Sequence, residues 1–238
     1  MFIRHIMIKS TLEKVISEDL AEIWSVLESD EKRLVIDNFV IHNFKKNQII
    51  YAEGEAPEYL WCLIKGKVKK FKDGIGGRQQ ILRLHRPIQY FGYRAYFANE
   101  PYVSSAAAFE ASTLGAVPMK LVEELIHKNQ KLAWFFIREL SRNLGGSDTK
   151  IVNLTQKHIR GRLAEALIVL KDNYGYEDDN STLRIYMARE DLANLSNMTT
   201  SNAIRTLTSF VSEKIITVDG RRIKIINEPM LRKISKFG

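Results

Sequence analysis

The sequence predicts an α+β protein in which a small β-barrel or sandwich leads into a long helix and then into a helix–turn–helix with a β-hairpin. Three observations support this order. Short segments rich in β-branched and aromatic residues alternate with glycines over residues 40–120. Apolar residues then recur at spacings of three and four over residues 120–156. Residues 187–227 contain two short amphipathic helical patterns followed by two alternating strand patterns.

The composition is that of an ordinary globular protein with a core of its own. The 238 residues are 45% hydrophobic and 27% charged, with a net charge of +8. No apolar run reaches the roughly 18 residues of a membrane span, and the opening MFIRHIMIKS lacks the features of a signal peptide. We therefore expect no membrane contact, and the single cysteine of the sequence favours the cytoplasm. The excess of basic over acidic residues favours a polyanionic partner such as nucleic acid.

The sequence contains no residue set that suits a metal cofactor. Its one cysteine, Cys62, lies in the apolar stretch LWCLI, so we expect a buried and inert thiol that cannot hold an iron–sulfur cluster. His85 is the one histidine at a suitable barrel position for haem, and a lone histidine is more often structural. We expect no haem, no other metal and no cofactor. Without a nucleophile–base pair or a phosphate-cradling loop, an enzyme is not expected either.

Residues 40–120 are expected to form the barrel, and an amphipathic helix is expected within residues 8–38. The segments QIIYAEGE, EYLWCLIKGKVKKF and YFGY have the composition of strands, and glycines separate them at fairly regular spacing. KDGIGGR contains Asp-Gly and Gly-Gly pairs, which accept positive φ and so close a hairpin. Many short strands at this spacing are typical of a small sandwich or barrel.

One long helix is predicted over residues 120–156, with a seam typical of a coiled coil. The seam residues are Ile137, Leu140, Leu144, Ser147, Ile151 and Leu154. We predict a homodimer along this seam, because the pattern is longer than one small barrel could cover. The alternative is a helix packed against its own barrel. Gly145 and Gly146 each cost about 1 kcal/mol relative to alanine in a helix, which marks either a hinge or a close approach of two helices.

The C-terminal pattern predicts a winged helix–turn–helix, whose second helix fits the major groove of DNA. Asn197 stands where the turn needs a left-handed residue, and Thr199 can cap the second helix. The predicted DNA-binding residues are Thr199, Thr200, Ser201, Asn202 and Arg205 on the helix, with Arg221, Arg222 and Lys224 on the hairpin. Arg205 suits a guanine edge and the hairpin cations suit phosphates. Similar geometry also occurs in folds that never touch DNA.

In this order, the segments resemble the Crp/Fnr family of bacterial transcription regulators, the cyclic-AMP receptor protein type, over about residues 20–230. IIYAEGEAPEYLWCLIKGKVKKF is similar to its first barrel strands, YFGYRAYF to its phosphate-binding loop, IRGRLAEAL to its hinge and REDLANLSNMTTSNAIRTLTSF to its reading head. The resemblance implies a cyclic-nucleotide-binding-like barrel (a double-stranded β-helix or jelly roll) over residues 1–120. It further implies a dimerisation helix over 121–156, a winged helix–turn–helix over 157–238 and a homodimer on a pseudo-palindromic DNA site.

The loop FGYRAYFANEPYVSS, residues 91–105, departs from the pattern of the nucleotide-binding members. Where they have a glutamate for the ribose and an arginine for the cyclic phosphate, this sequence has Tyr93 and Val103. Burying a phosphate without a charged partner is costly. We therefore expect no useful affinity for cyclic AMP.

Three alternatives are open for this pocket. An unknown small ligand, such as an anion, could be bound by Gly92, Tyr93, Arg94, Ser104 and Ser105. The aromatic side chains could instead fill the barrel, with Arg94 paired to Glu100 or in solvent. The third alternative is a cyclic nucleotide, which would lack its usual partners here.

The reading head departs from the family too. Thr200 and Ser201 stand where members often have an arginine and a glutamate, so we expect an operator that differs from the usual family site. The resemblance also implies a contact with RNA polymerase near Asp178, Asp179 and Asn180, although this loop is unusually acidic. The expected function is that of a homodimeric DNA-binding transcription regulator. The alternative is a ligand-binding sensor module whose DNA binding is weak or conditional.

Overall fold

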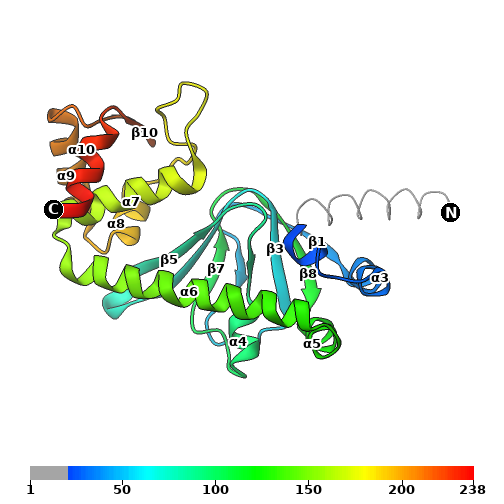
Figure 1. Cartoon of the computed structure of the whole chain (residues 1–238). Helices are drawn as coiled ribbons and strands as arrows, with labels where there is room; N and C mark the ends of the chain where they lie inside the picture. The colour runs from blue at the N-terminus through cyan, green and yellow to red at the C-terminus, as the bar shows by residue number, and fades with distance from the viewer. Residues whose placement is uncertain (1–20) are drawn as a thin grey trace. The chain divides into compact units, whose positions relative to one another are not determined.

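The computed structural model describes residues 21–238, which form two compact units (Figure 1). The first unit contains residues 21–72 and 82–144, and the second contains residues 73–81 and 145–238. The helix predicted within residues 8–38 lies partly outside the described residues. Inside them, two short helices are found, α2 (Ala21–Trp24) and α3 (Ser29–Asn38). They are separate because Glu28 and Glu31 form a capping box that starts α3 afresh.

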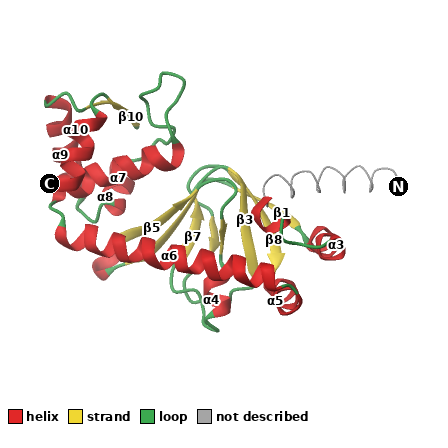
Figure 2. Ribbon diagram, in the orientation of Figure 1, coloured by secondary structure: helices red, strands yellow, loops and turns green. Residues whose placement is uncertain are grey.

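The barrel predicted over residues 40–120 is confirmed as two four-stranded sheets, drawn as yellow arrows in Figure 2. The strand order is β1-β8-β3-β6 in one sheet and β2-β7-β4-β5 in the other. The bounds are β1 Val40–Phe44, β2 Ile49–Tyr51, β3 Tyr59–Lys65, β4 Val68–Asp73, β5 Gln79–His85, β6 Tyr90–Phe91, β7 Ser105–Ala108 and β8 Ser112–Pro118. Buried side chains from both sheets, such as Leu63, Val68 and Leu114, share one core cluster. The two sheets therefore enclose a common interior.

The connection between β4 and β5 contains the predicted turn. Gly76 and Gly77 have φ of 72° and 73°, which glycine adopts without strain. The strand predicted through YFGY is shorter than expected, because β6 ends at Phe91. Gly92, at φ 96°, turns the chain into the helix α4 (Tyr93–Phe97). A left-handed glycine at this point ends the ladder, which strand composition alone did not reveal.

The prediction of a single helix over residues 120–156 is wrong, because the chain forms two helices there. These are α5 (Met119–Lys128) and α6 (Gln130–Gln156), separated by Asn129. The Asn129 side-chain amide donates to the Val26 carbonyl at 2.8 Å and to the Glu31 carboxylate at 2.7 Å. Its carbonyl oxygen accepts from the Leu132 amide at 3.1 Å, which caps the start of α6. Asn129 therefore breaks the helix by bonding to distant residues.

The second unit contains the predicted helix–turn–helix and hairpin. Its elements are α7 (Ile159–Tyr174), α8 (Arg189–Leu195), α9 (Thr200–Ser212), β9 (Ile216–Asp219), β10 (Arg222–Ile225) and α10 (Glu228–Phe237). Helices α7 and α10 pack closely, since a Cβ on Gly161 would lie 2.1 Å from the Gly238 carbonyl oxygen. Among the described residues, none of the helices combines the length and apolar content that a bilayer crossing needs.

Candidate DNA interface and effector pocket

Helix α9 carries the predicted DNA-contacting residues at its start. The Thr199 hydroxyl accepts a hydrogen bond from the Asn202 amide at 3.2 Å, which confirms the predicted N-cap. Asn197 in the preceding turn has φ 52°, the left-handed conformation expected of it. The turn and the cap together define where α9 begins and which residues lie at its positive end.

The two faces of α9 differ as the apolar spacing predicts. Ala203, Leu207 and Phe210 are buried in the core. The exposed residues of the opposite face are Thr200, Ser201, Ile204, Arg205 and Thr208. Arg205 has no hydrogen bond or ion pair within the part of the chain that the structure describes. Ile204 and Thr208 were missed, although spacings of four from Thr200 would have placed both on this face.

Arg162 on α7 holds the turn of the helix–turn–helix in place. Its Nε donates to the Ser196 carbonyl at 3.0 Å, and its Nη2 donates to the Asn197 carbonyl at 3.1 Å. Hydrogen bonds from a charged donor are stronger than neutral ones. The sequence offered no sign of this role, because the partners lie 34 and 35 residues further along the chain.

The wing closes through a two-residue turn, Gly220-Arg221. Arg189, the first residue of α8, donates from Nη2 to the Gly220 carbonyl at 2.7 Å, which fastens the turn to the helix–turn–helix. Arg222 lies over the ring of Tyr186, with its guanidinium 5.3 Å from the ring centroid. Arg221 is exposed and has no ion pair among the described residues. Of the two predicted wing arginines, Arg222 is therefore engaged by an aromatic ring, whereas the Arg221 side chain is available for a DNA phosphate.

The acidic loop before α8 is tied to the wing. Asp179 accepts from the Thr182 hydroxyl at 2.6 Å and from its amide at 2.8 Å, and it pairs with Lys224 at 3.4 Å. The Thr182 hydrogen bonds hold the pKa of the Asp179 carboxyl well below its usual range. Lys224 therefore already has a carboxylate partner. Asp178 and Asn180 are exposed beside it.

The predicted seam on α6 is largely uncovered. Leu144 and Ile151 are 65% and 60% exposed, Ile137 and Ser147 are exposed too, and Leu140 and Leu154 are half-buried. A Cβ added to Gly145 or Gly146 would meet no atom of the described chain within 4 Å. This apolar row is therefore open to a second copy of the chain.

Tyr93 and Arg94, two of the predicted pocket residues, contact different parts of the protein. Tyr93 is buried, and its hydroxyl accepts from the Asn143 side chain on α6 at 3.0 Å. Burial raises the pKa of the Tyr93 hydroxyl to about 12. Arg94 pairs with Glu100 at 2.7 Å on the surface, which is one of the alternatives that the sequence left open.

The other predicted pocket residues serve the packing of the barrel. A Cβ on Gly92 would lie 2.8 Å from a backbone oxygen of β3, so only glycine fits there. Tyr102, one of the aromatic residues of the same 91–105 loop, stacks on Tyr51 with the ring centroids 3.8 Å apart. Ser104 is buried, and the Ser105 hydroxyl accepts a backbone amide hydrogen bond at 3.0 Å. These contacts favour the alternative in which aromatic side chains fill this part of the barrel.

Lys70 on β4 is a charged residue that sequence reasoning missed. It lies opposite Ala106, a member of the barrel core, so its side chain starts toward the same interior. Lys70 has no hydrogen bond or ion pair within the described residues. Burial and the nearby Arg94 and Arg83 lower the pKa of the Lys70 ammonium to about 8. The sequence did contain a signal for this placement: Lys70 is two residues from the apolar Val68 on one strand, and residues two apart on a strand face the same side of the sheet. An unmatched interior cation suits an anionic ligand.

His85, considered above as a haem ligand, lies buried on β5. Its ring stacks on Phe91 with the centroids 4.7 Å apart. Burial and the nearby cations Arg83 and Lys70 lower the pKa of the imidazole to about 3, so it is neutral at physiological pH. Cys62 is 1% exposed, which confirms the predicted burial of its side chain.

Replacing Ile88, in the turn between β5 and β6, with glycine should make the protein more stable. Its φ is 72°, although it is β-branched, and its side chain is 49% exposed. The left-handed conformation costs such a residue about 1–2 kcal/mol, so we expect Ile88→Gly to raise the free energy of unfolding by about 1 kcal/mol. Urea denaturation measures this. Ile226→Gly, at an equally exposed position without positive φ, should not stabilise; equal effects would show that strain is not the cause.

Comparison with known proteins agrees with this architecture. Residues 41–129 match the cyclic nucleotide-binding domain, and residues 161–234 match the Crp-like helix-turn-helix domain. Regulatory protein HlyX of Actinobacillus pleuropneumoniae is 26% identical over 200 residues, which cover 83% of this chain and 83% of that protein. The fumarate and nitrate reduction regulatory protein of Vibrio cholerae is 26% identical over 192 residues, 80% of this chain and 76% of its own.

The fold has counterparts among solved structures as well. FixK2 from Bradyrhizobium japonicum superposes with a TM-score of 0.75 at 21% identity, covering 82% of this chain and 96% of its own. At this identity the likeness establishes the fold, while the sequence matches are to regulators rather than to enzymes. The two matched domains are the barrel and the reading head, in that order, and the long helix α6 lies between them in the chain. The chain therefore belongs to the Crp/Fnr family of transcription regulators, which bind DNA through the helix–turn–helix and act as dimers.

Proposed function

We propose that this protein reads a pseudo-palindromic operator as a homodimer, with one α9 helix in each of two major grooves about one helical turn apart. The observation that carries this proposal is the exposed face of α9, on which Arg205 has no partner within the described residues. The capped helix start suits phosphate oxygens beside Thr200 and Ser201. Arg221 on the wing suits the phosphate backbone.

A gel shift on the DNA upstream of its own gene, followed by footprinting, tests this function. We expect a protected site with dyad symmetry. A footprint without symmetry would count against paired α9 helices. Absence of any shift, in the presence or absence of small-molecule extracts, would favour a sensor module that does not act through DNA.

Arg205→Ala should weaken operator binding by about 1–3 kcal/mol and relax the preference at one base pair in each half-site. The reason is that an arginine can donate two hydrogen bonds to one guanine edge, and alanine donates none. Binding to a set of single-base operator variants measures the effect. Arg33→Ala on α3 removes an exposed arginine from the barrel unit and serves as the matched control. Equal weakening on every sequence would make Arg205 a phosphate contact instead.

We further propose that a small ligand with an anionic group, rather than cyclic AMP, regulates DNA binding from the barrel unit. Lys70 and Arg83 support this, because neither has a carboxylate partner among the described residues. Val103, at the position of the phosphate-binding arginine, is 44% exposed and offers no charge. Calorimetry should detect no binding of cyclic AMP or cyclic GMP. Micromolar affinity for either nucleotide would refute this part of the proposal.

We propose that the protein acts in the cytoplasm, where it would meet its DNA operator. We also propose that it uses no iron–sulfur cluster and no haem. The burial of Cys62 and the neutral, stacked ring of His85 support structural roles for both side chains. For a contact with RNA polymerase, we propose Asp178 and Asn180, because Asp179 is engaged by Thr182 and by the wing.

A further inference from the structure

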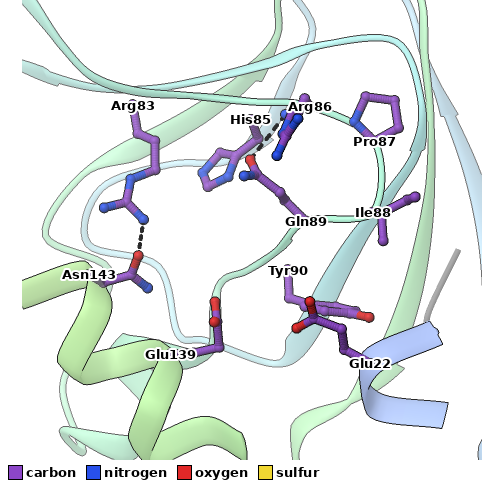
Figure 3. A pocket seen from close by; sticks show the side chains of 10 residues that line it. All are labelled: Glu22, Arg83, His85, Arg86, Pro87, Ile88, Gln89, Tyr90, Glu139 and Asn143. Atoms are coloured by element: carbon purple, nitrogen blue, oxygen red, sulfur yellow. Dashed lines mark hydrogen bonds between the residues drawn. The ribbon is translucent and has the colours of Figure 1, made fainter. Parts of the chain in front are cut away.

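A pocket of about 360 Å³ lies between the β5–β6 turn and α6 (Figure 3). Arg83 and His85 come from β5, Gln89 and Tyr90 from the turn and the start of β6, and Glu139 and Asn143 from α6. This volume is sufficient for a small organic ligand. The pocket lies outside the 91–105 loop, where the sequence analysis had placed its ligand-binding alternatives.

Arg83 forms the cationic end of this pocket. Its guanidinium donates to the Asn143 side-chain oxygen, an uncharged acceptor, and has no carboxylate within 4 Å among the described residues. Lys70 is close enough to affect the same region, since its charge contributes to the lowered pKa of His85. A guanidinium with free N–H groups in a half-buried wall suits a carboxylate, which can accept two parallel hydrogen bonds.

Glu139 and Glu22 supply the anionic part of the lining, below the two arginines in the view of Figure 3. Glu139 pairs with Arg142 at 2.9 Å, but that partner is largely exposed and three residues away on the same helix. Such pairs contribute little. Figure 3 shows Arg83 and Glu139 lining the same space, and they form no ion pair with each other. Opposite charges therefore face one cavity without neutralising each other.

The rest of the lining fixes the class of ligand. The pocket is lined by two arginines, Arg83 and Arg86, and by two glutamates, Glu22 and Glu139. Because its imidazole is neutral, His85 adds no charge to this balance. A purely anionic ligand would leave the glutamates unmatched, and a purely cationic ligand would leave the arginines unmatched.

We propose that this pocket binds a small zwitterion of the size of an α-amino acid, with its carboxylate at Arg83 and its ammonium group at Glu139. This deepens, and rests on, the proposed regulatory function. Binding would act on α6 directly, because Asn143 links Arg83 to the Tyr93 hydroxyl and immediately precedes the seam residue Leu144. A carboxylate at Arg83 competes with Asn143, and so couples ligand binding to the seam.

The test is calorimetry of the full chain with each of the twenty common α-amino acids, with acetate and methylamine as probes that carry only one of the two charges. We expect at least one amino acid to bind while neither single-charge probe does. Arg83→Met and Glu139→Gln should each weaken that binding about tenfold or more. Arg138→Met, which removes an exposed charge next to Glu139 in sequence but outside the pocket, should leave it unchanged.

Two results would overturn the inference. The first is that no amino acid binds. The second is that acetate binds as well as any amino acid and Glu139→Gln has no effect, which would indicate a simple anion site. DNA binding is measured separately on the same variants without ligand. An amino acid that binds to a chain that never binds DNA would refute the proposed function and leave the pocket assignment intact.

Discussion

Replacing Leu144 and Ile151 together with lysine should turn the dimer into a monomer and abolish tight operator binding. Both side chains are more than half exposed on α6, seven residues apart along the predicted seam. Burying one such side chain contributes about 1.5–3 kcal/mol, and the double change removes two from each subunit and adds like charges across the seam. A monomer also loses the second half-site, which is worth about 10²–10⁴ in affinity.

Sedimentation equilibrium measures the oligomeric state, and band shifts on full and half operators measure the affinity. The matched control is Thr149→Lys with Gln156→Lys, which places the same charges, also seven residues apart, on the exposed face away from the seam. The control should remain a dimer. If the seam variant dimerises as well as the control, the dimer interface lies elsewhere.

Lys70→Met should make the protein more stable at neutral pH, by up to about 3 kcal/mol. The pKa of Lys70 falls from 10.5 to about 8 on folding, so the folded state holds this proton less tightly than the unfolded state. A tenfold change in proton affinity corresponds to about 1.4 kcal/mol. The wild-type protein carries the full cost below pH 8 and loses it as the pH rises from about 8 to 10.5, so its stability increases across that window.

Urea denaturation at pH 7 and pH 9.5 checks this sign. Lys70→Met should lack the increase with pH that Lys70 contributes to the wild type. Lys65→Met removes an exposed lysine from β3 and should leave both values nearly unchanged. If Lys70→Met destabilises the protein at pH 7, then Lys70 is matched by a group in the folded protein, and its assignment to an anionic ligand fails.

Local patterns were sufficient for the elements that depend on near neighbours in the chain. The helical spacing of Ala203, Leu207 and Phe210 predicted the buried face of α9, and the turn chemistry of Asn197 and Thr199 predicted where that helix begins. The same held for the hairpins, because positive φ at glycine is a property of a few consecutive residues. The colinear series of motifs then identified the family.

Contacts between distant segments decided the rest. Asn129 ends one helix and starts another by bonding to groups 103 and 98 residues away, which no helical period can show. Arg83 and Asn143, 60 residues apart, meet only because β5 lies against α6. The sequence by itself thus determined the order of parts and the reading head, and it predicted, through the family resemblance, that the usual cyclic-phosphate partner is missing. Only the tertiary structure showed where unmatched charges face a cavity, because the cost of a charge depends on its surroundings and not on its sequence neighbours.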